Sequence, residues 1–169
     1  KELDIDPGMT STAAFRIKPT RMGALEGTVT IPHDGLEADD LIGALAHQAG
    51  ERGDFETFMV TPDKDFGQLV NERTRIYKPG RAGSDVEILG VGEVCERWGI
   101  SRPEQVIDVL ALMGDASDNI PGIKGVGEKT AVKLIQKFGD VETMIARAGE
   151  IEGKLGEKIK EGAEAARLS

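Results

Sequence analysis

The 169-residue sequence has very little cysteine, histidine or aromatic residue. Its single cysteine, Cys95, excludes an internal disulfide and is compatible with a reducing compartment. One cysteine and two histidines are too few for a typical zinc site, so a metal site in this chain would use oxygen ligands. Aromatic residues make up only 4%, so Trp98 and Tyr77 are expected to pack in the core rather than to stack on bases.

Long apolar runs and an excess of positive charge are also missing. No run approaches the roughly 20 apolar residues of a membrane-spanning helix, and no basic segment followed by an apolar one marks a secretory signal. The net charge of −9 argues against a generally basic nucleic-acid binder. Its distribution is more informative, because residues 121–139 hold four lysines and one glutamate while carboxylates cluster at 37–40, 63–65 and 115–118. An acidic surface that only maintains solubility is the alternative explanation.

Two chemistries meet between Met113 and Ala131. Asp115 and Asp118 are about one helical turn apart, a spacing that lets two carboxylates reach one hard cation. Residues 121–130 follow as a glycine-punctuated loop before a helix, where tight turns and free backbone N–H groups suit an anion. Solvated caps and ordinary turns produce the same composition, so this stretch alone leaves its function open.

The hydrophobic pattern predicts strands early in the chain and helices late. Residues 1–27 are broken by proline and glycine, and only 15–18 resembles a short strand. Further strands are predicted at 28–31, 55–60, 75–78 and 86–89, and helices at 37–52, 66–70, 91–98, 103–113, 128–138, 141–148 and 151–166. The helix at 103–113 is predicted to bury an apolar stripe of Val106, Ile107, Val109, Leu110 and Met113. The order of the elements favours an α/β sheet layer with a small helical unit attached.

The first acidic groups lie at element ends. Glu37, Asp39 and Asp40 fall in the first turn of the helix at 37–52, where simple capping is a serious alternative to metal binding. The apolar run at 55–60 fits a buried strand. Asp63 and Asp65 directly follow it, and ligands of open α/β sheets bind at the carboxyl ends of strands. A metal site at this edge is therefore the more specific hypothesis.

Four segments, taken in order, carry a family resemblance. They are EADDLIGALA at 37–46, VTPDKDFGQLV at 60–70, DVLALMGDASDNIPGIKGVGEKTA at 108–131 and KLIQKFGDVE at 133–142. Together they resemble the 5′-nuclease domain of bacterial DNA polymerase I and its flap-endonuclease relatives. The resemblance implies a partial parallel-sheet, PIN-like nuclease core at 28–107 and a helix-three-turn-helix unit at 108–169, after an unmatched leader at 1–27. The chain is expected to correspond to the C-terminal portion of that domain.

The resemblance also implies a site of two divalent ions, usually Mg²⁺ with Mn²⁺ as a substitute. By position, the family's metal-binding acids correspond to Glu37, Asp39, Asp40, Asp63, Asp65, Asp115 and Asp118. Among these, Asp63, Asp65 and Asp115 are expected to be catalytic. Two such ions activate a water and stabilise the leaving oxygen of a phosphodiester.

The family's helix-three-turn-helix binds duplex DNA, and its loop carbonyls often coordinate K⁺. The matching residues of this chain are Lys124, Gly125, Gly127, Lys129, Thr130 and Lys133. Their phosphate contacts would position DNA without reading its sequence. The implied partners are duplex or 5′-flap DNA and a fused or associated DNA polymerase, with no membrane and a cytoplasmic, nucleoid-associated location in bacteria.

Two functional hypotheses therefore remain. The family's first strand with its Asp-Gly-Asn-Ser-like ending, a second strand with an essential aspartate and the helical arch have no match, and Asp4 and Asp6 do not supply them. The first hypothesis is a 5′→3′ exonuclease or flap endonuclease of DNA replication and repair, or part of one. The alternative is a non-catalytic duplex-DNA-binding module that has lost the N-terminal catalytic half. Seven mutually repelling carboxylates favour the first.

Overall fold

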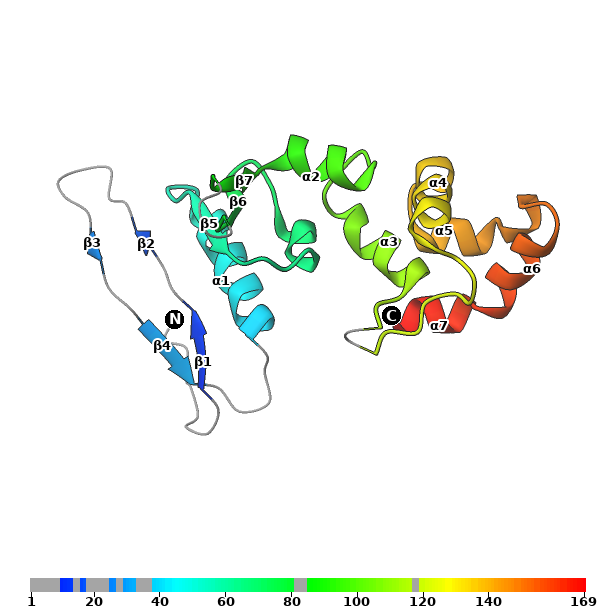
Figure 1. Cartoon of the computed structure of the whole chain (residues 1–169), viewed down its shortest axis with the longest axis horizontal. Helices are drawn as coiled ribbons and strands as arrows, with labels where there is room; N and C mark the ends of the chain where they lie inside the picture. The colour runs from blue at the N-terminus through cyan, green and yellow to red at the C-terminus, as the bar shows by residue number, and fades with distance from the viewer. Residues whose placement is uncertain are drawn as a thin grey trace. The chain divides into compact units, whose positions relative to one another are not determined.

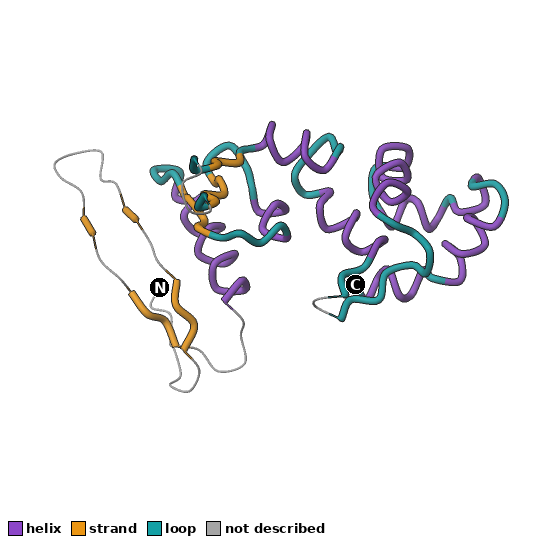
Figure 2. Tube along the Cα trace, in the orientation of Figure 1, coloured by secondary structure: helices purple, strands orange, loops and turns teal. Residues whose placement is uncertain are grey.

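The computed structural model describes residues 10–13, 16–17, 25–26, 29–32, 38–80, 85–116 and 119–169. The chain divides into two compact units, residues 1–90 and residues 91–169. All the described strands belong to the first unit, and the described elements of the second are helices (Figures 1 and 2). No helix within the described ranges is both long and apolar enough to cross a membrane.

Two short antiparallel pairs precede the first helix. Strand β1 (Thr10–Ala13) pairs with β4 (Val29–Pro32), and β2 (Arg16–Ile17) pairs with β3 (Leu25–Glu26). The predicted strands at 15–18 and 28–31 are confirmed over their described residues, whereas β1 and β3 were not predicted. Proline and glycine interrupt the apolar alternation in this region, so the local sequence does not mark these strands. They are recognised by their pairing with β4 and β2.

The main sheet of the first unit has the order β5-β6-β7. Its strands are β5 (Thr57–Val60), β6 (Thr74–Lys78) and β7 (Glu87–Leu89). Strand β5 is parallel to β6, but β7 is antiparallel to it, so the sheet is mixed rather than purely parallel. The difference follows from the connections: a short connection joins β6 directly to β7, whereas a longer segment carrying the 3-10 helix η1 (Asp65–Leu69) joins β5 to β6.

Only one face of this sheet is buried by the described residues. Met59, Ile76 and Leu89 lie side by side across the three strands and are buried. The neighbouring Phe58 and Val60 are 40% and 58% exposed, because successive side chains of a strand point to opposite faces. The prediction of a buried strand at 55–60 was therefore wrong for one of its two faces.

Helix α1 (Ala38–Arg52) covers part of the first unit and packs against β5 and η1. Its Leu41 and Ala46 are buried. The side-by-side placement of α1 and β5 is visible in Figure 1. A β-carbon on Gly43 would lie 3.6 Å from Cδ1 of Leu69, so this glycine lets the helix pack closely on η1.

The second unit is a bundle of short helices around one apolar core. They are α2 (Val91–Trp98), α3 (Gln105–Met113), α4 (Glu128–Phe138), α5 (Val141–Ala146), η2 (Ala148–Glu150), α6 (Lys154–Glu161) and α7 (Ala163–Leu168). Val106, Val109, Leu112, Ile135 and Met144 are at most 1% exposed. As predicted, Trp98 packs in this core, where it is buried.

Three predicted features of this unit need correction. Helix α3 begins at Gln105 rather than 103, because Pro103 and Glu104 form a turn before it. Ile107, predicted on the apolar stripe, is 51% exposed. The single helix predicted at 151–166 is two helices, separated at Gly162, where a β-carbon would lie 2.9 Å from Ile123 Cγ2.

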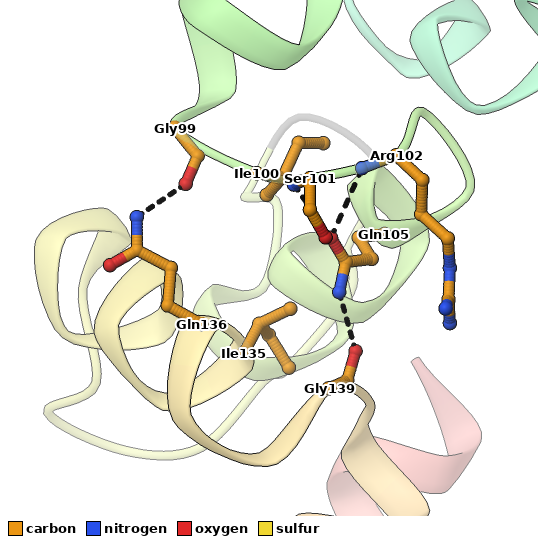
Figure 3. A pocket seen from close by; sticks show the side chains of 8 residues that line it. All are labelled: Gly99, Ile100, Ser101, Arg102, Gln105, Ile135, Gln136 and Gly139. Carbon is orange, nitrogen blue, oxygen red and sulfur yellow. Dashed lines mark hydrogen bonds between the residues drawn. The ribbon is translucent and has the colours of Figure 1, made fainter.

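Buried Gln105 joins the start of α3 to the end of α4 (Figure 3). Its Oε1 accepts hydrogen bonds from the Ser101 amide and hydroxyl, both at 2.9 Å, and its Nε2 donates to the Gly139 carbonyl at 2.6 Å. Nearby, Gln136 Nε2 donates to the Gly99 carbonyl at 2.6 Å. The side chains drawn in Figure 3 line an open hollow of about 350 Å³. Because the side chains of Gln105 and Gln136 bond to backbone carbonyls at helix ends, we assign these residues of the hollow a structural role.

Asp140 caps the next helix. Its Oδ1 accepts from the Thr143 amide at 2.7 Å and its Oδ2 from the Thr143 hydroxyl at 3.0 Å, which is the usual N-cap arrangement. The Thr143 amide lowers the pKa of the Asp140 carboxyl. A carboxyl whose folded-state pKa is lowered stabilises the fold above its unfolded-state pKa, and this contribution disappears as the pH falls through the folded-state value.

We therefore expect Asp140→Ala to reduce the free energy of unfolding by about 1 kcal/mol at pH 7. Urea unfolding at pH 7 and at pH 3 should show the difference from the wild type shrinking on acidification. Asp140→Asn is the control, since it keeps an acceptor but cannot titrate. A deficit for Asp140→Ala that grows as the pH falls would contradict this account.

Candidate metal centre and nucleic-acid interface

A turn fixed by side-chain hydrogen bonds presents two aspartates at the end of β5. The Asp63 amide donates to Thr61 Oγ1 at 3.1 Å, and the Asp65 amide donates to Asp63 Oδ1 at 3.0 Å. Thr61 is buried, Asp63 is exposed and Asp65 is half-buried. Lys64 Nζ lies 3.9 Å from Asp65 Oδ1. These bonds are formed within the turn, so the position of the aspartates follows from local sequence once β5 is in place.

Helix α1 brings two more aspartates toward the same end of the sheet. The helix packs against β5, and only residues 53–56 connect the two, so helix and strand run in opposite directions. The first turn of α1, with exposed Asp39 and Asp40, therefore lies toward the end where β5 finishes. Gly43, one turn after Asp39, packs on Leu69 of η1, which begins at Asp65. Four oxygen-donor side chains thus come from two adjoining segments of one unit.

The seven-carboxylate cluster stays a prediction. Glu37 and Asp118 lie outside the described residues. Asp115 belongs to the second unit, where it is 8% exposed. Within the described residues, no group of three or more histidine, cysteine, aspartate or glutamate side chains is arranged to hold a metal ion. The described residues therefore offer a metal ion pairs of carboxylates rather than a complete set of protein ligands.

The loop after α3 depends on a close approach of two glycines. Gly114 has φ +73° and Gly122 has φ +57°, which L side chains rarely adopt. A β-carbon on Gly122 would collide with the Gly114 amide nitrogen, and one on Gly114 would lie 2.7 Å from the Ile120 carbonyl oxygen. Between them, the Asp115 amide donates to Ile120 O at 3.0 Å and the Ile120 amide donates to Asp115 O at 2.8 Å. Asp115 is thus held in a narrow backbone loop.

From Gly122 onward, buried and exposed residues alternate along the loop. Ile123 and Val126 are buried, and the Ile123 amide donates to Leu112 O at 2.8 Å, which fixes the loop to the end of α3. Lys124, Gly125 and Gly127 are exposed. The apolar side chains therefore anchor the loop while its lysine and glycine backbone face solvent.

Helix α4 continues this exposed surface. Its buried residues are Ala131, Leu134, Ile135 and Phe138, whereas Lys129 and Lys133, one turn apart, are exposed. Thr130 is half-buried, and its amide donates to Gly127 O at 2.9 Å. Of the six residues predicted to contact DNA, five are exposed and lie between the loop and the second turn of α4. We call this segment, residues 124–133, the lysine loop.

A hydroxyl from α7's C-terminal end holds Gly122, two residues before the lysine loop. The Gly122 amide donates to Ser169 Oγ at 3.2 Å, and that hydroxyl donates to Ala165 O at 2.8 Å. Figure 1 shows α7 beside the segment that leads from α3 to α4. No sequence pattern connects positions so far apart, so this contact is visible only in the structure.

Comparison with protein families identifies the chain. Residues 20–99 match the 5′-3′ exonuclease N-terminal resolvase-like domain, and residues 101–169 match the 5′-3′ exonuclease C-terminal SAM fold. The chain belongs to the 5′-3′ exonuclease family, which confirms the predicted resemblance. The predicted domain bounds at 27/28 and 107/108 stay a prediction.

Curated relatives are bacterial DNA polymerases I. The chain is 45% identical to DNA polymerase I of Bacillus subtilis over 134 residues, covering 79% of this chain and 15% of that protein. It is 40% identical to the thermostable DNA polymerase I of Thermus thermophilus over 145 residues, covering 86% of this chain and 17% of that protein. The chain thus spans about a sixth of the length of these relatives.

The fold is similar to a solved nuclease. The structure of T5 5′-exonuclease with bound zinc has a TM-score of 0.67 at 24% identity, over 78% of this chain and 47% of that chain. This similarity confirms the predicted fold class, an α/β nuclease core followed by a helical unit.

The two glycine positions allow a direct test of the loop geometry. Gly122→Ala should lower the free energy of unfolding by about 2–4 kcal/mol, because it adds both a backbone collision and a strained φ. Gly127→Ala is the matched control, since Gly127 has extended backbone and nothing within 4 Å of an added β-carbon. Its cost should be at most about 1 kcal/mol. Equal losses in denaturant unfolding would contradict the close approach.

Proposed function

We propose that this chain is part of a metal-dependent 5′→3′ exonuclease or 5′-flap endonuclease that hydrolyses DNA phosphodiesters in replication and repair. The observation that carries the proposal is the hydrogen-bonded Thr61–Asp63–Asp65 turn at the end of β5. Ligand sites of α/β sheets form at this edge, and the first turn of α1 brings Asp39 and Asp40 toward it. Family membership provides the reaction class.

The donor set suits hard divalent cations. All four described side chains at this edge, and Asp115 in the second unit, are carboxylates. Mg²⁺ keeps several waters and is commonly held by one or two carboxylates together with substrate phosphates. Pairs of solvent-accessible aspartates therefore fit Mg²⁺, or Mn²⁺ in its place, better than they fit a metal that needs a full set of protein ligands. Glu37 and Asp118 complete the proposed ligand set.

Bound divalent ions would supply an activated water and charge stabilisation at the leaving oxygen. The protein's own contribution is positional. The Thr61 hydroxyl and the Asp65 amide hold the Asp63 turn in one geometry. Asp115, held by its backbone bonds to Ile120, is the proposed third catalytic carboxylate.

The lysine loop is the proposed duplex-binding surface. Exposed Lys124, Lys129 and Lys133 would contact phosphates, with the exposed backbone of Gly125 and Gly127 and the Thr130 side chain beside them. A K⁺ ion on the loop carbonyls belongs to the same proposal. A related T5 flap endonuclease has been solved in complex with DNA and metal ions, which supports DNA as the substrate. A DNA polymerase, fused or associated, is the proposed partner, since the curated relatives are DNA polymerases I.

A non-catalytic duplex-binding module is the second candidate. The observation that favours it is the lack of any three-member ligand group within the described part of the chain. Both candidates need the lysine loop, so only an assay of cleavage separates them.

Cleavage of a 5′-flap DNA with and without Mg²⁺ is the first test. The chain should release the flap only with Mg²⁺, and Asp63→Asn and Asp115→Asn should each reduce cleavage to background by removing a charged ligand. Asp54→Asn is the matched control, because exposed Asp54 precedes the opposite end of β5. Full activity in Asp63→Asn would overturn the proposed site. If no cleavage occurs at any Mg²⁺ concentration, the nuclease is excluded and the non-catalytic duplex-binding module is the remaining candidate.

Binding to duplex DNA is the second test, measured by fluorescence anisotropy across a salt series. Affinity should fall steeply with salt and should be similar for duplexes of different sequence. Lys129→Gln and Lys133→Gln should each reduce the slope of log K against log salt by about 0.9, because each removes one phosphate contact. Lys78→Gln, in the first unit, is the control. Affinity that does not change with salt would exclude both candidate functions.

A further inference from the structure

A lysine from outside the lysine loop lies against it. Helix α6 carries three exposed lysines, Lys154, Lys158 and Lys160. A β-carbon on Gly125 would lie 2.6 Å from Nζ and 3.8 Å from Cε of Lys158. The ammonium group of Lys158 is therefore next to the exposed backbone of Gly125, which follows exposed Lys124 in the chain.

The packing of α6 explains why Lys158 reaches this position. Ile159 is fully buried and Gly156 is buried as well, so this side of α6 faces the core of the second unit. Gly162 contacts Ile123, the buried anchor of the loop. Lys158 precedes Gly162 by four residues and shares its face. The contact that fixes α6 to the loop thus also directs Lys158 toward it.

The charge of Lys158 has no acidic partner in the described residues. No ion pair with an aspartate or glutamate of the described ranges involves Lys158, whereas Arg167 on α7 bonds to both Glu142 and Glu164. Lys124, which precedes Gly125 in the chain, is also exposed. An ammonium group beside exposed glycine backbone, in a segment that carries another exposed lysine, suits an anion with several oxygens, such as a phosphodiester.

We propose that Lys158 is an additional phosphate-contacting residue, which extends the duplex-binding surface from the lysine loop onto α6. This inference rests on the proposed function, because it presumes that the lysine loop binds DNA. It makes the interface discontinuous in sequence, with one cation from α6 and the others from the lysine loop.

Duplex binding by Lys158→Gln tests the inference, again by anisotropy across a salt series on the whole chain. The affinity should fall roughly five- to tenfold at 0.1 M salt, and the slope of log K against log salt should fall by about 0.9, as for the loss of one phosphate contact. Lys160→Gln is the matched control, with the same change in charge on the same helix. It lies about 200° further around α6, so its affinity and slope should remain those of the wild type.

Two further measurements separate phosphate contact from support of the loop. Lys158→Arg should keep the wild-type salt slope, because it keeps the positive charge. Lys158→Gln, Lys160→Gln and Lys158→Arg should all unfold at the same denaturant concentration as the wild type. A wild type that binds, with equal slopes for Lys158→Gln and Lys160→Gln, would overturn this inference and leave the proposed function intact. Weakened binding with an unchanged slope would also overturn it. A wild type that shows no salt-sensitive binding would refute the proposed function itself.

Discussion

The close approach of Gly114 and Gly122 is the constraint on which the second unit depends. Their backbones are near enough that a β-carbon on either would collide with the other strand of the loop. This contact closes the short turn that holds Asp115 and directs the chain from α3 into the lysine loop. The Ser169 hydroxyl then bonds to the same Gly122 amide, so the proposed catalytic aspartate and the proposed DNA surface share one support.

The first unit positions its aspartates by other interactions. They lie at the end of β5 and in the first turn of α1, and the turn after β5 is fixed by Thr61 and Asp63 rather than by glycine. Asp39, Asp40 and Asp63 are exposed and Asp65 is half-buried, whereas Asp115 is buried. Exposed carboxylates at a sheet edge can share ions with a substrate, because hydrated Mg²⁺ needs few protein ligands.

Sequence alone predicted the elements whose signals are local. Helix α4 runs from Glu128 to Phe138 as its apolar spacing indicated, and the glycine-rich loop before it was recognisable from composition and from the family resemblance. The sequence did not indicate β1, the antiparallel direction of β7, the exposure of Ile107 or the contacts of Lys158 and Ser169 with the loop. The pairing of β1 and the contacts of Lys158 and Ser169 depend on partners elsewhere in the chain, and no local periodicity records the positions of those partners. The candidate metal acids were found by resemblance, and their convergence stays a prediction.

The alternation of buried Ile123 and Val126 with exposed Lys124, Gly125 and Gly127 separates two properties that are often coupled in proteins. Anchoring residues determine whether the loop keeps its shape, while solvent-facing residues determine its charge. Substitution of exposed Lys124 can therefore change the charge of the loop with little change in stability, whereas Gly125, with φ +81°, takes a side chain only with strain.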